Sequence, residues 1–351
     1  MPHISRKHSV ANPVSFIAGL VFVLVSASLT PASAQVISPV QSGHYAPAVI
    51  NIRDMGYPPS GLFVITYNLF ISSDTYIDRE GNELKTLSLG QLDPTLPSVD
   101  LQIDLNAFST VPALFWGSSF TLLGGARYLV GVSPSYVTAS GTVVSEARGG
   151  ATDTTIRSVD EATVAGWGDL FVAPLGLSWG FDQFDATFFY GFYAPTGRYA
   201  TGDDDNMGLG FWTHQVQGYG YYYPIPDHST AIMLGLTYEL NGTVKDADVT
   251  PGNRFSLEWG ISQYLSEQLE VGVQGGHNWQ VSDDTGDDVY WDPSFYDRKS
   301  TIAFSLGYWP WKNRLYIAGR YSFDLGIRAR FKSNYWSVNL LFLTNALTGE
   351  G

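Results

Sequence analysis

The most constraining feature of this 351-residue chain is an alternation of long and short connectors between stretches whose apolar residues recur at every second position. Long connectors are expected near residues 74–97, 135–165, 196–210, 241–253, 283–299 and 324–333, and short ones near residues 116–118, 181–183, 224–229, 266–268 and 310–313. A transmembrane β-barrel produces this pattern, because its strands return through brief turns on one side of the membrane and longer loops on the other. A soluble β-sandwich has no reason to sort its loops in this way.

Residues 1–34 have the organisation of a secretory signal peptide. Arg6 and Lys7 precede an apolar run over residues 16–29, and an Ala-Ser-Ala cleavage signal follows at residues 32–34. The apolar run is shorter than the roughly 20 residues that a helix needs to cross a bilayer. We therefore expect the chain to be exported, with a mature N-terminus at Gln35.

The composition agrees with an exported membrane protein. Charged residues make up only 15% of the chain and aromatic residues another 15%, whereas a soluble domain carries about 25% charged residues. The chain has no cysteine, which excludes disulfides and an N-terminal lipid-modified cysteine. The formal net charge of −14 argues against nucleic acid as a partner.

The mature chain divides into a lead-in and a barrel. Residues 35–60 show no strand pattern and are either a periplasmic tail or a plug inside the barrel. Residues 61–351 are predicted to form an all-β, antiparallel transmembrane barrel of about twelve strands, an even number that returns both ends to the periplasm. The clearest alternation lies at residues 99–106, where the apolar residues are expected to face lipid and the polar ones the lumen.

Strand parity assigns a set of polar residues to the lumen. They are Asp104, Asn106, Arg127, Gln215, Gln217, Glu239, Glu258, Gln274, Asn278 and Arg320. Charged groups of both signs suit either a hydrogen-bonded packing of a narrow lumen or the lining of a substrate path. The sequence leaves both interpretations open.

Two acidic runs, at residues 203–205 and 283–288, fall in the expected outer loops. Closely spaced carboxylates can bind Ca²⁺, but the second run has Ser294 where a calcium loop of the EF-hand type places its twelfth-position Glu. We therefore expect no metal site and no cofactor, and loops that are solvated or bridged to lipopolysaccharide by divalent cations.

Catalysis has little support in the sequence. The mature chain contains four histidines, His44, His214, His228 and His277, and neither a G-x-S-x-G elbow nor an H-E-x-x-H pair. We expect a protein that is not an enzyme. The alternatives to a channel are a structural or surface-interaction barrel with a packed lumen and a barrel enzyme that acts on lipids.

The run over residues 166–224, which includes YAPTGRY and GLGFWTHQ, resembles the signature region of the phenol meta-pathway degradation family. The resemblance implies an outer-membrane barrel of a Gram-negative bacterium that passes small hydrophobic, including aromatic, compounds passively. Such a barrel contacts outer-membrane lipid and lipopolysaccharide and is inserted by the barrel-assembly machinery. Barrels of this kind often end on an aromatic residue, whereas here Phe342 is followed by LTNALTGEG, so the insertion signal is internal or atypical.

Overall fold

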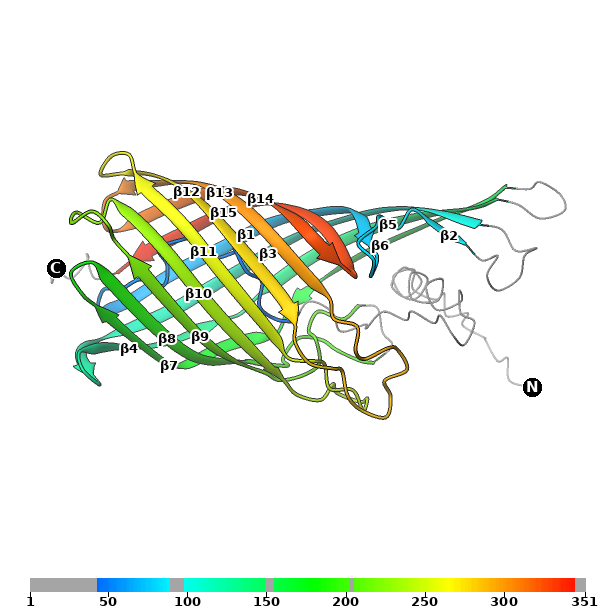
Figure 1. Cartoon of the computed structure of the whole chain (residues 1–351), viewed down its shortest axis with the longest axis horizontal. Helices are drawn as coiled ribbons and strands as arrows, with labels where there is room; N and C mark the ends of the chain where they lie inside the picture. The colour runs from blue at the N-terminus through cyan, green and yellow to red at the C-terminus, as the bar shows by residue number, and fades with distance from the viewer. Residues whose placement is uncertain (1–42, 89–97, 149–154, 202–204, 345–351) are drawn as a thin grey trace, which may run out of the picture.

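The computed structural model describes residues 43–88, 98–148, 155–201 and 205–344. The predicted signal peptide and residues 35–42 of the predicted lead-in lie outside the described residues. Within them, twelve strands close an antiparallel barrel, which confirms the predicted fold class (Figure 1). No helix of the described residues is long and apolar enough to cross a membrane.

The barrel wall consists of strands that pair mostly with their neighbours in sequence, and it closes where β1 pairs with both β3 and β15. Its members are β1 (Gly61–Ile77), β3 (Ser98–Leu122), β4 (Ala126–Ser133), β7 (Leu170–Gly180), β8 (Phe184–Ala194), β9 (Thr213–Tyr222), β10 (Thr230–Asn241), β11 (Arg254–Tyr264), β12 (Leu269–Gln280), β13 (Arg298–Trp311), β14 (Leu315–Arg328) and β15 (Arg330–Leu343). Closure gives every strand two partners. The backbone N–H and C=O groups are therefore paired within the wall, which they need because hydrocarbon offers no hydrogen-bond partner.

A second group of strands extends one side of the barrel beyond the others. Strand β3 pairs with β4 along residues 114–122 and with β5 (Tyr136–Arg148) along residues 98–110. Strand β6 (Thr155–Trp167) pairs with β5, and the short β2 (Thr86–Ser88) pairs with the start of β3. We call β2, β5, β6 and residues 98–110 of β3 the flap; it projects past the barrel at the end where the long loops lie (Figure 1).

Alternation of apolar residues explains the two faces of the wall. In β10, Ala231 and Met233 are buried, whereas Ile232 and Leu234 between them are exposed. A strand whose exposed face is apolar is stable only against lipid, which places the wall in a membrane. The outward residues therefore form a lipid-facing band, and the inward ones form the lumen.

The observed connectors correct part of the expected pattern. The expected turn at residues 116–118 lies inside β3, which turns instead at residues 123–125. The expected long connector at 324–333 belongs to β14 and β15, which meet at Ala329 with a positive φ of 53°. The expected connector at 135–165 contains the β5–β6 hairpin. The periodicity of apolar residues missed β5, β6 and the loop ends of β14 and β15, because the outward faces of these segments are partly polar.

The polarity of residues 99–106 is also opposite to the prediction. Leu101 and Ile103 are buried, whereas Asp104 and Asn106 are exposed on the outward face and bonded to one another over 2.6 Å. The expectation that Asp104 and Asn106 face the lumen is therefore wrong. The prediction assumes that the apolar residues of this segment face lipid. This half of β3 belongs to the flap instead, where the outward face is polar.

Candidate functional site

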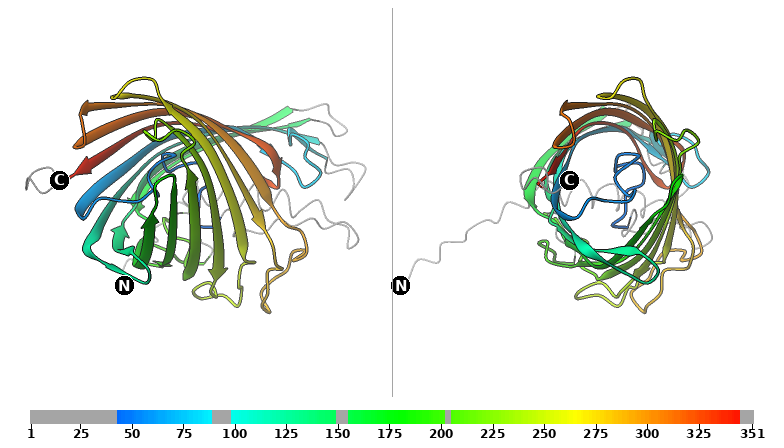
Figure 2. Two further views of the ribbon diagram at one scale, coloured as in Figure 1. Left: turned by 60° about the vertical axis from the view of Figure 1, so that its left-hand side comes forward. Right: turned by 90° about the vertical axis from the view of Figure 1, so that its left-hand side faces the viewer.

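The lumen contains the segment Gly43–Ser60, which leads directly into β1. It lies inside the ring of strands and touches several sides of the wall (Figure 2). It runs from the loop end, near the start of β9, to the short-turn end, where β1 begins. We call residues 43–60 the lumen segment.

The loop end of the lumen segment is held by His44. Its Nε2 lies 2.9 Å from Asp169, at the break between β6 and β7, and its Nδ1 lies 2.8 Å from the Thr213 hydroxyl. Asp169 also accepts the backbone N–H groups of Gly197 and Leu209. Burial opposes ionisation of Asp169, but the hydrogen bonds from His44 and the two N–H groups hold its pKa below the ordinary value. This contact joins the lumen segment, the wall and the β8–β9 loop.

Two buried glutamates of the wall bind the backbone of the lumen segment. Glu239 accepts the N–H groups of His44 and Tyr45 over 3.1 and 2.9 Å. Glu258 accepts the N–H of Ala48 over 2.7 Å and the hydroxyl of Tyr45 over 3.0 Å. A chain without its own secondary structure has unpaired N–H groups, and these carboxylates satisfy them.

Arg320 satisfies the carbonyl groups of the same part of the lumen segment. Its guanidinium donates to the carbonyls of Ala48 over 2.7 Å, Val49 over 3.0 Å, and Ile50. It also donates to the side chain of Gln274 over 2.7 Å. The five fixed donors of a guanidinium suit this clustered set of acceptors. Glu239, Glu258 and Arg320 of the wall thus all bind the backbone of the lumen segment.

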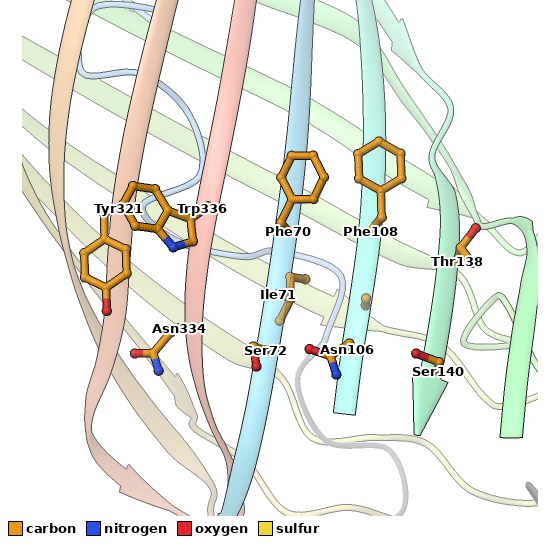
Figure 3. Close-up of a pocket in the computed structure, with 11 residues that line it drawn as sticks. Phe70, Ile71, Ser72, Asn106, Phe108, Thr138, Ser140, Tyr321, Asn334 and Trp336 are labelled. Atoms are coloured by element: carbon orange, nitrogen blue, oxygen red, sulfur yellow. The ribbon is translucent and has the colours of Figure 1, made fainter. Parts of the chain in front are cut away.

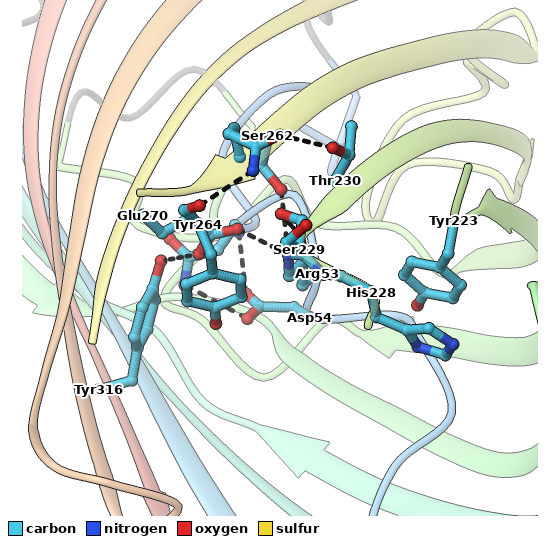
Figure 4. A network of polar contacts seen from close by, with 12 residues as sticks. Arg53, Asp54, Tyr223, His228, Ser229, Thr230, Ser262, Tyr264, Glu270 and Tyr316 are labelled. Carbon is cyan, nitrogen blue, oxygen red and sulfur yellow. Dashed lines mark hydrogen bonds and ion pairs between the residues drawn. The ribbon is translucent and has the colours of Figure 1, made fainter. Parts of the chain in front are cut away.

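The short-turn end of the lumen segment is held by Arg53. Its Nε donates to Glu270 over 2.7 Å and to Ser262 over 3.0 Å (Figure 4). Its terminal nitrogens donate to the carbonyls of His228 and Ser229 in the β9–β10 turn. Arg53 therefore ties the lumen segment to the neighbouring strands β11 and β12 and to the turn that joins β9 to β10.

Glycines on the inner wall of β11 and β12 give the lumen segment its space. A Cβ at Gly272 would lie 2.6 Å from the side chain of Ile52, and one at Gly260 would lie 3.0 Å from it. A Cβ at Gly276 would lie 2.7 Å from the Cβ of Pro47. Any side chain at these positions would press against the lumen segment.

The opposite half of the lumen is apolar. Buried side chains of β1, β3, β4, β7 and β8 form one cluster, which we call the apolar stripe: Phe63, Ile65, Tyr67, Leu69, Ala113, Phe115, Leu129, Ala173 and Phe189. Val49, Ile50 and Met55 of the lumen segment pack against it. The segment is thus hydrogen-bonded to the polar half and in contact with the apolar half.

A cavity lies at each end of the apolar stripe. At the short-turn end, a cavity of about 240 Å³ lies between the lumen segment and the wall, beside Phe63 and Ile65. At the loop end, a cavity of about 350 Å³ borders Ile71 of the same strand. A further space of about 10 Å³ next to Met55 and Phe115 shares Phe63 and Ile65 with the short-turn cavity.

The structure places the predicted lumen residues as follows. Seven are buried on the inner face: Gln215, Gln217, Glu239, Glu258, Gln274, Asn278 and Arg320. Arg127 is half-buried and donates to the carbonyl of Pro58. Asp104 and Asn106 are exposed on the outward face of the flap.

Several residues of the lumen were not found from the sequence. Arg53 lies in a segment without a strand pattern, and Asp169 directly precedes β7, so strand parity places neither of them. Glu270 and Asn339 are buried in strands, where the same parity rule would have found them. The inward glycines of β11 and β12 were a further signal, because a glycine beside charged inward residues marks the close approach of another chain segment.

The acidic run at residues 283–288 is held by hydrogen bonds within the loops. Asp284 is buried and accepts from the indole of Trp291 over 2.7 Å and from the backbone of Gly252 over 2.7 Å. Among the described residues, no group of three His, Asp or Glu side chains is arranged to hold a metal ion. Residues 203 and 204 of the other run lie outside the described residues.

Comparison with solved structures finds similar barrels. The chain aligns with the COG4313 outer membrane channel of Pseudomonas putida F1 at a TM-score of 0.60 and 14% identity, over 84% of this chain and 99% of that chain. It aligns with a Pseudomonas aeruginosa FadL homologue at a TM-score of 0.41 and 10% identity, over 83% of this chain and 92% of that chain. A comparison with curated proteins finds no match.

The fold and its lipid-facing band place the protein in the outer membrane, since single-chain barrels with short turns on one side and long loops on the other are outer-membrane proteins. The family model described as "Putative MetA-pathway of phenol degradation" matches residues 91–340, which include ten of the twelve barrel strands in full and most of β15. Because the match covers most of the chain, the chain belongs to this family.

Proposed function

We propose that the protein is an outer-membrane channel through which small hydrophobic compounds pass passively into the periplasm. The observation that carries this proposal is the apolar stripe with a cavity at each end. Strand β1 borders the loop-end cavity with Ile71 and the other cavity with Phe63 and Ile65. A lumen that served only to stabilise the barrel would be packed along its length, without an apolar stripe that connects two cavities.

The lumen segment acts as the plug of this channel. The carboxylates and the guanidinium that bind its backbone at residues 44–50 lie on β10, β11 and β14. The side chains of Val49, Ile50 and Met55 contact the apolar stripe, where Tyr67 also donates a hydrogen bond to Asp54 over 2.8 Å. Apolar side chains change rotamer more readily than buried ionic hydrogen bonds break. Passage therefore occurs between the stripe and the segment, with the segment still bound to the polar half.

The comparisons support the same role. The solved barrel with a TM-score of 0.60 is named as an outer membrane channel, and the family description connects its members with phenol degradation. We infer that small aromatic compounds are among the substrates. Passive passage needs no catalytic group and no cofactor. Lipopolysaccharide around the loops and the barrel-assembly machinery during insertion are the partners that we propose for such a barrel.

Uptake into lipid vesicles tests the proposal. Phe189 is buried on the inner face and borders the space of about 10 Å³ next to Met55, whereas its neighbour Phe188 is exposed on the outward face. We expect Phe189→Ala to raise the uptake of naphthalene and the single-channel conductance, and Phe188→Ala to leave both unchanged. Heat-modifiable migration on gels checks that both variants fold.

Absence of both uptake and conductance in the wild type and in Phe189→Ala would overturn the channel. The second candidate, a structural barrel with a packed lumen, would then stand. It is favoured by the buried hydrogen bonds of Glu258 and Arg320 to the lumen segment.

A further inference from the structure

The flap has the reverse polarity of the barrel wall below it. On its inner face, Leu105, Gly141 and Ala162 form one row across β3, β5 and β6, and Ala107, Ala139 and Val164 form the next. On its outer face, the row between them consists of Asn106, Ser140 and Thr163. A wall that faces lipid is apolar outside, so this sheet is built for polar surroundings outside and apolar contact inside.

The outer surface marks where the lipid-facing band ends. Tyr321, Trp336, Phe70 and Phe108 form one row of rings across neighbouring strands (Figure 3). Asn334, Ser72, Asn106 and Ser140 form a polar row beside them, toward the flap (Figure 3). Aromatic rings followed by polar groups are typical of the membrane–water boundary. The flap therefore begins where the hydrocarbon ends, and its apolar inner face looks toward the barrel mouth.

The loop-end cavity of about 350 Å³ lies against this inner face. Its floor is made of small side chains, among them Ala107, Ala139 and Ala162. Phe331 closes one side, where its ring packs edge-on against Tyr76 with 5.1 Å between centroids. The volume falls within the range of about 300–1,000 Å³ that is usual for ligand pockets.

The polar groups at this cavity are few and uncharged. The polar residues that border it are Ser73, Asn106, Ser140 and Ser333, and the hydroxyls of Ser73 and Ser333 are bonded to each other over 2.5 Å. No carboxylate or ammonium group of the described residues is among its lining. A charged ligand would lose its hydration here without gaining a partner. An apolar ligand with at most a hydroxyl group would lose nothing.

We propose that this cavity is a binding site for small uncharged apolar molecules, with one or two rings, which it collects at the mouth of the barrel. An apolar cavity of about 150 Å³ is enough to hold benzene, so this larger one has room for a fused pair of rings. As an entry site the cavity rests on the proposed channel function. Binding itself requires no passage, so the two can fail separately.

Cysteine labelling tests the site directly, because the natural chain has no cysteine. Ala139 borders the cavity, whereas Thr163 lies on the outer face of β6, is exposed and is not among the residues that border it. With naphthalene at about ten times its dissociation constant, alkylation of Ala139→Cys should slow by about tenfold and saturably. Alkylation of Thr163→Cys should keep its rate. If Ala139→Cys does not fold, Ala162→Cys in the same sheet replaces it.

A second substitution checks that shielding comes from the cavity. Ala107→Leu in the Ala139→Cys background fills the space, so naphthalene should no longer change the labelling rate. Phe108→Leu, on the outward face of the same strand, should leave the shielding intact. Equal labelling with and without naphthalene, or equal slowing at Thr163→Cys, overturns the site. Shielding without vesicle uptake would support the binding site and reject the channel. Uptake without shielding would support the channel and reject the binding site.

Discussion

At the scale of single residues, buried charge in this lumen serves a backbone that has no secondary structure. Arg320 is the clearest case, since its donors face the carbonyls of Ala48, Val49 and Ile50. A buried polar group that loses its partner costs about 1–3 kcal/mol. The lumen segment is therefore fixed in place by a few side chains of the wall, and each can be tested alone.

We predict that Arg320→Met loosens the lumen segment while the barrel stays folded. The carbonyls that Arg320 binds would lose their donor, which destabilises the docked segment by about 1–3 kcal/mol for each unpaired group. Trypsin cleavage after Arg53, which requires release from the wall, should then become faster. Lys312→Met is the control, because Lys312 makes an exposed ion pair of 2.6 Å with Glu267 that contributes little. Unchanged cleavage in Arg320→Met would show that other contacts hold the segment.

Gly276→Leu tests whether the lumen segment restricts the lumen, because Gly276 leaves the space that this segment occupies. The new Cβ would lie 2.7 Å from the Cβ of Pro47 and 3.0 Å from the nitrogen of Ala48, so the leucine must push the lumen segment away. We expect a higher single-channel conductance in planar bilayers. Gly319→Leu is the matched control, since no heavy atom lies within 4 Å of its added Cβ. Equal conductance in both variants would mean that the segment does not restrict the lumen.

At the scale of the strand, the same alternating pattern has opposite meanings in different parts of the molecule. In β10 the outward Leu234 meets lipid, whereas in β3 the outward Gln102 belongs to the flap. Leu234→Lys should destabilise the barrel by about 2–4 kcal/mol, the cost of a cation near the middle of a bilayer. Gln102→Lys should change the free energy of unfolding by less than about 0.5 kcal/mol, as surface substitutions usually do. Urea unfolding in lipid vesicles measures both, and equal costs would place the flap in the hydrocarbon.

At the scale of the whole molecule, Asp169 connects three parts that are distant in sequence: the lumen segment, the wall and the β8–β9 loop. Although burial opposes its ionisation, its hydrogen bonds hold its pKa below the ordinary value of 3.8. Its stabilising contribution is thus complete above about pH 4 and is lost as the pH falls through the lowered pKa.

We therefore predict that acid releases the loop end of the lumen segment. Channel openings in planar bilayers should stay constant from neutral pH to about pH 4 and become more frequent as the pH falls below it, as Asp169 is protonated. Asp169→Asn, which cannot ionise, should open more often already at neutral pH and should lack this acid step. An acid step of the same size in Asp169→Asn would assign the release to another group.

Much of the fold could be predicted from local pattern. The period-two segments and the sorted connectors are properties of neighbouring residues, so the barrel and its number of strands followed from them. Parity also placed residues such as Glu258 and Arg320 on the inner face. What these side chains bind could not be predicted, because their partners lie at Ala48, more than 200 positions away in the chain.

The sequence by itself determined that each strand has two different faces and that the strands close into a membrane barrel. The tertiary structure alone decided which medium each face meets. Residues 99–106 alternate as regularly as any strand in the band, yet their polar side faces outward, since β3 continues past the aromatic row into the flap. Alternation fixes the difference between two faces. Only the position of a strand relative to the membrane and to the lumen segment fixes which face is lipid, water or protein.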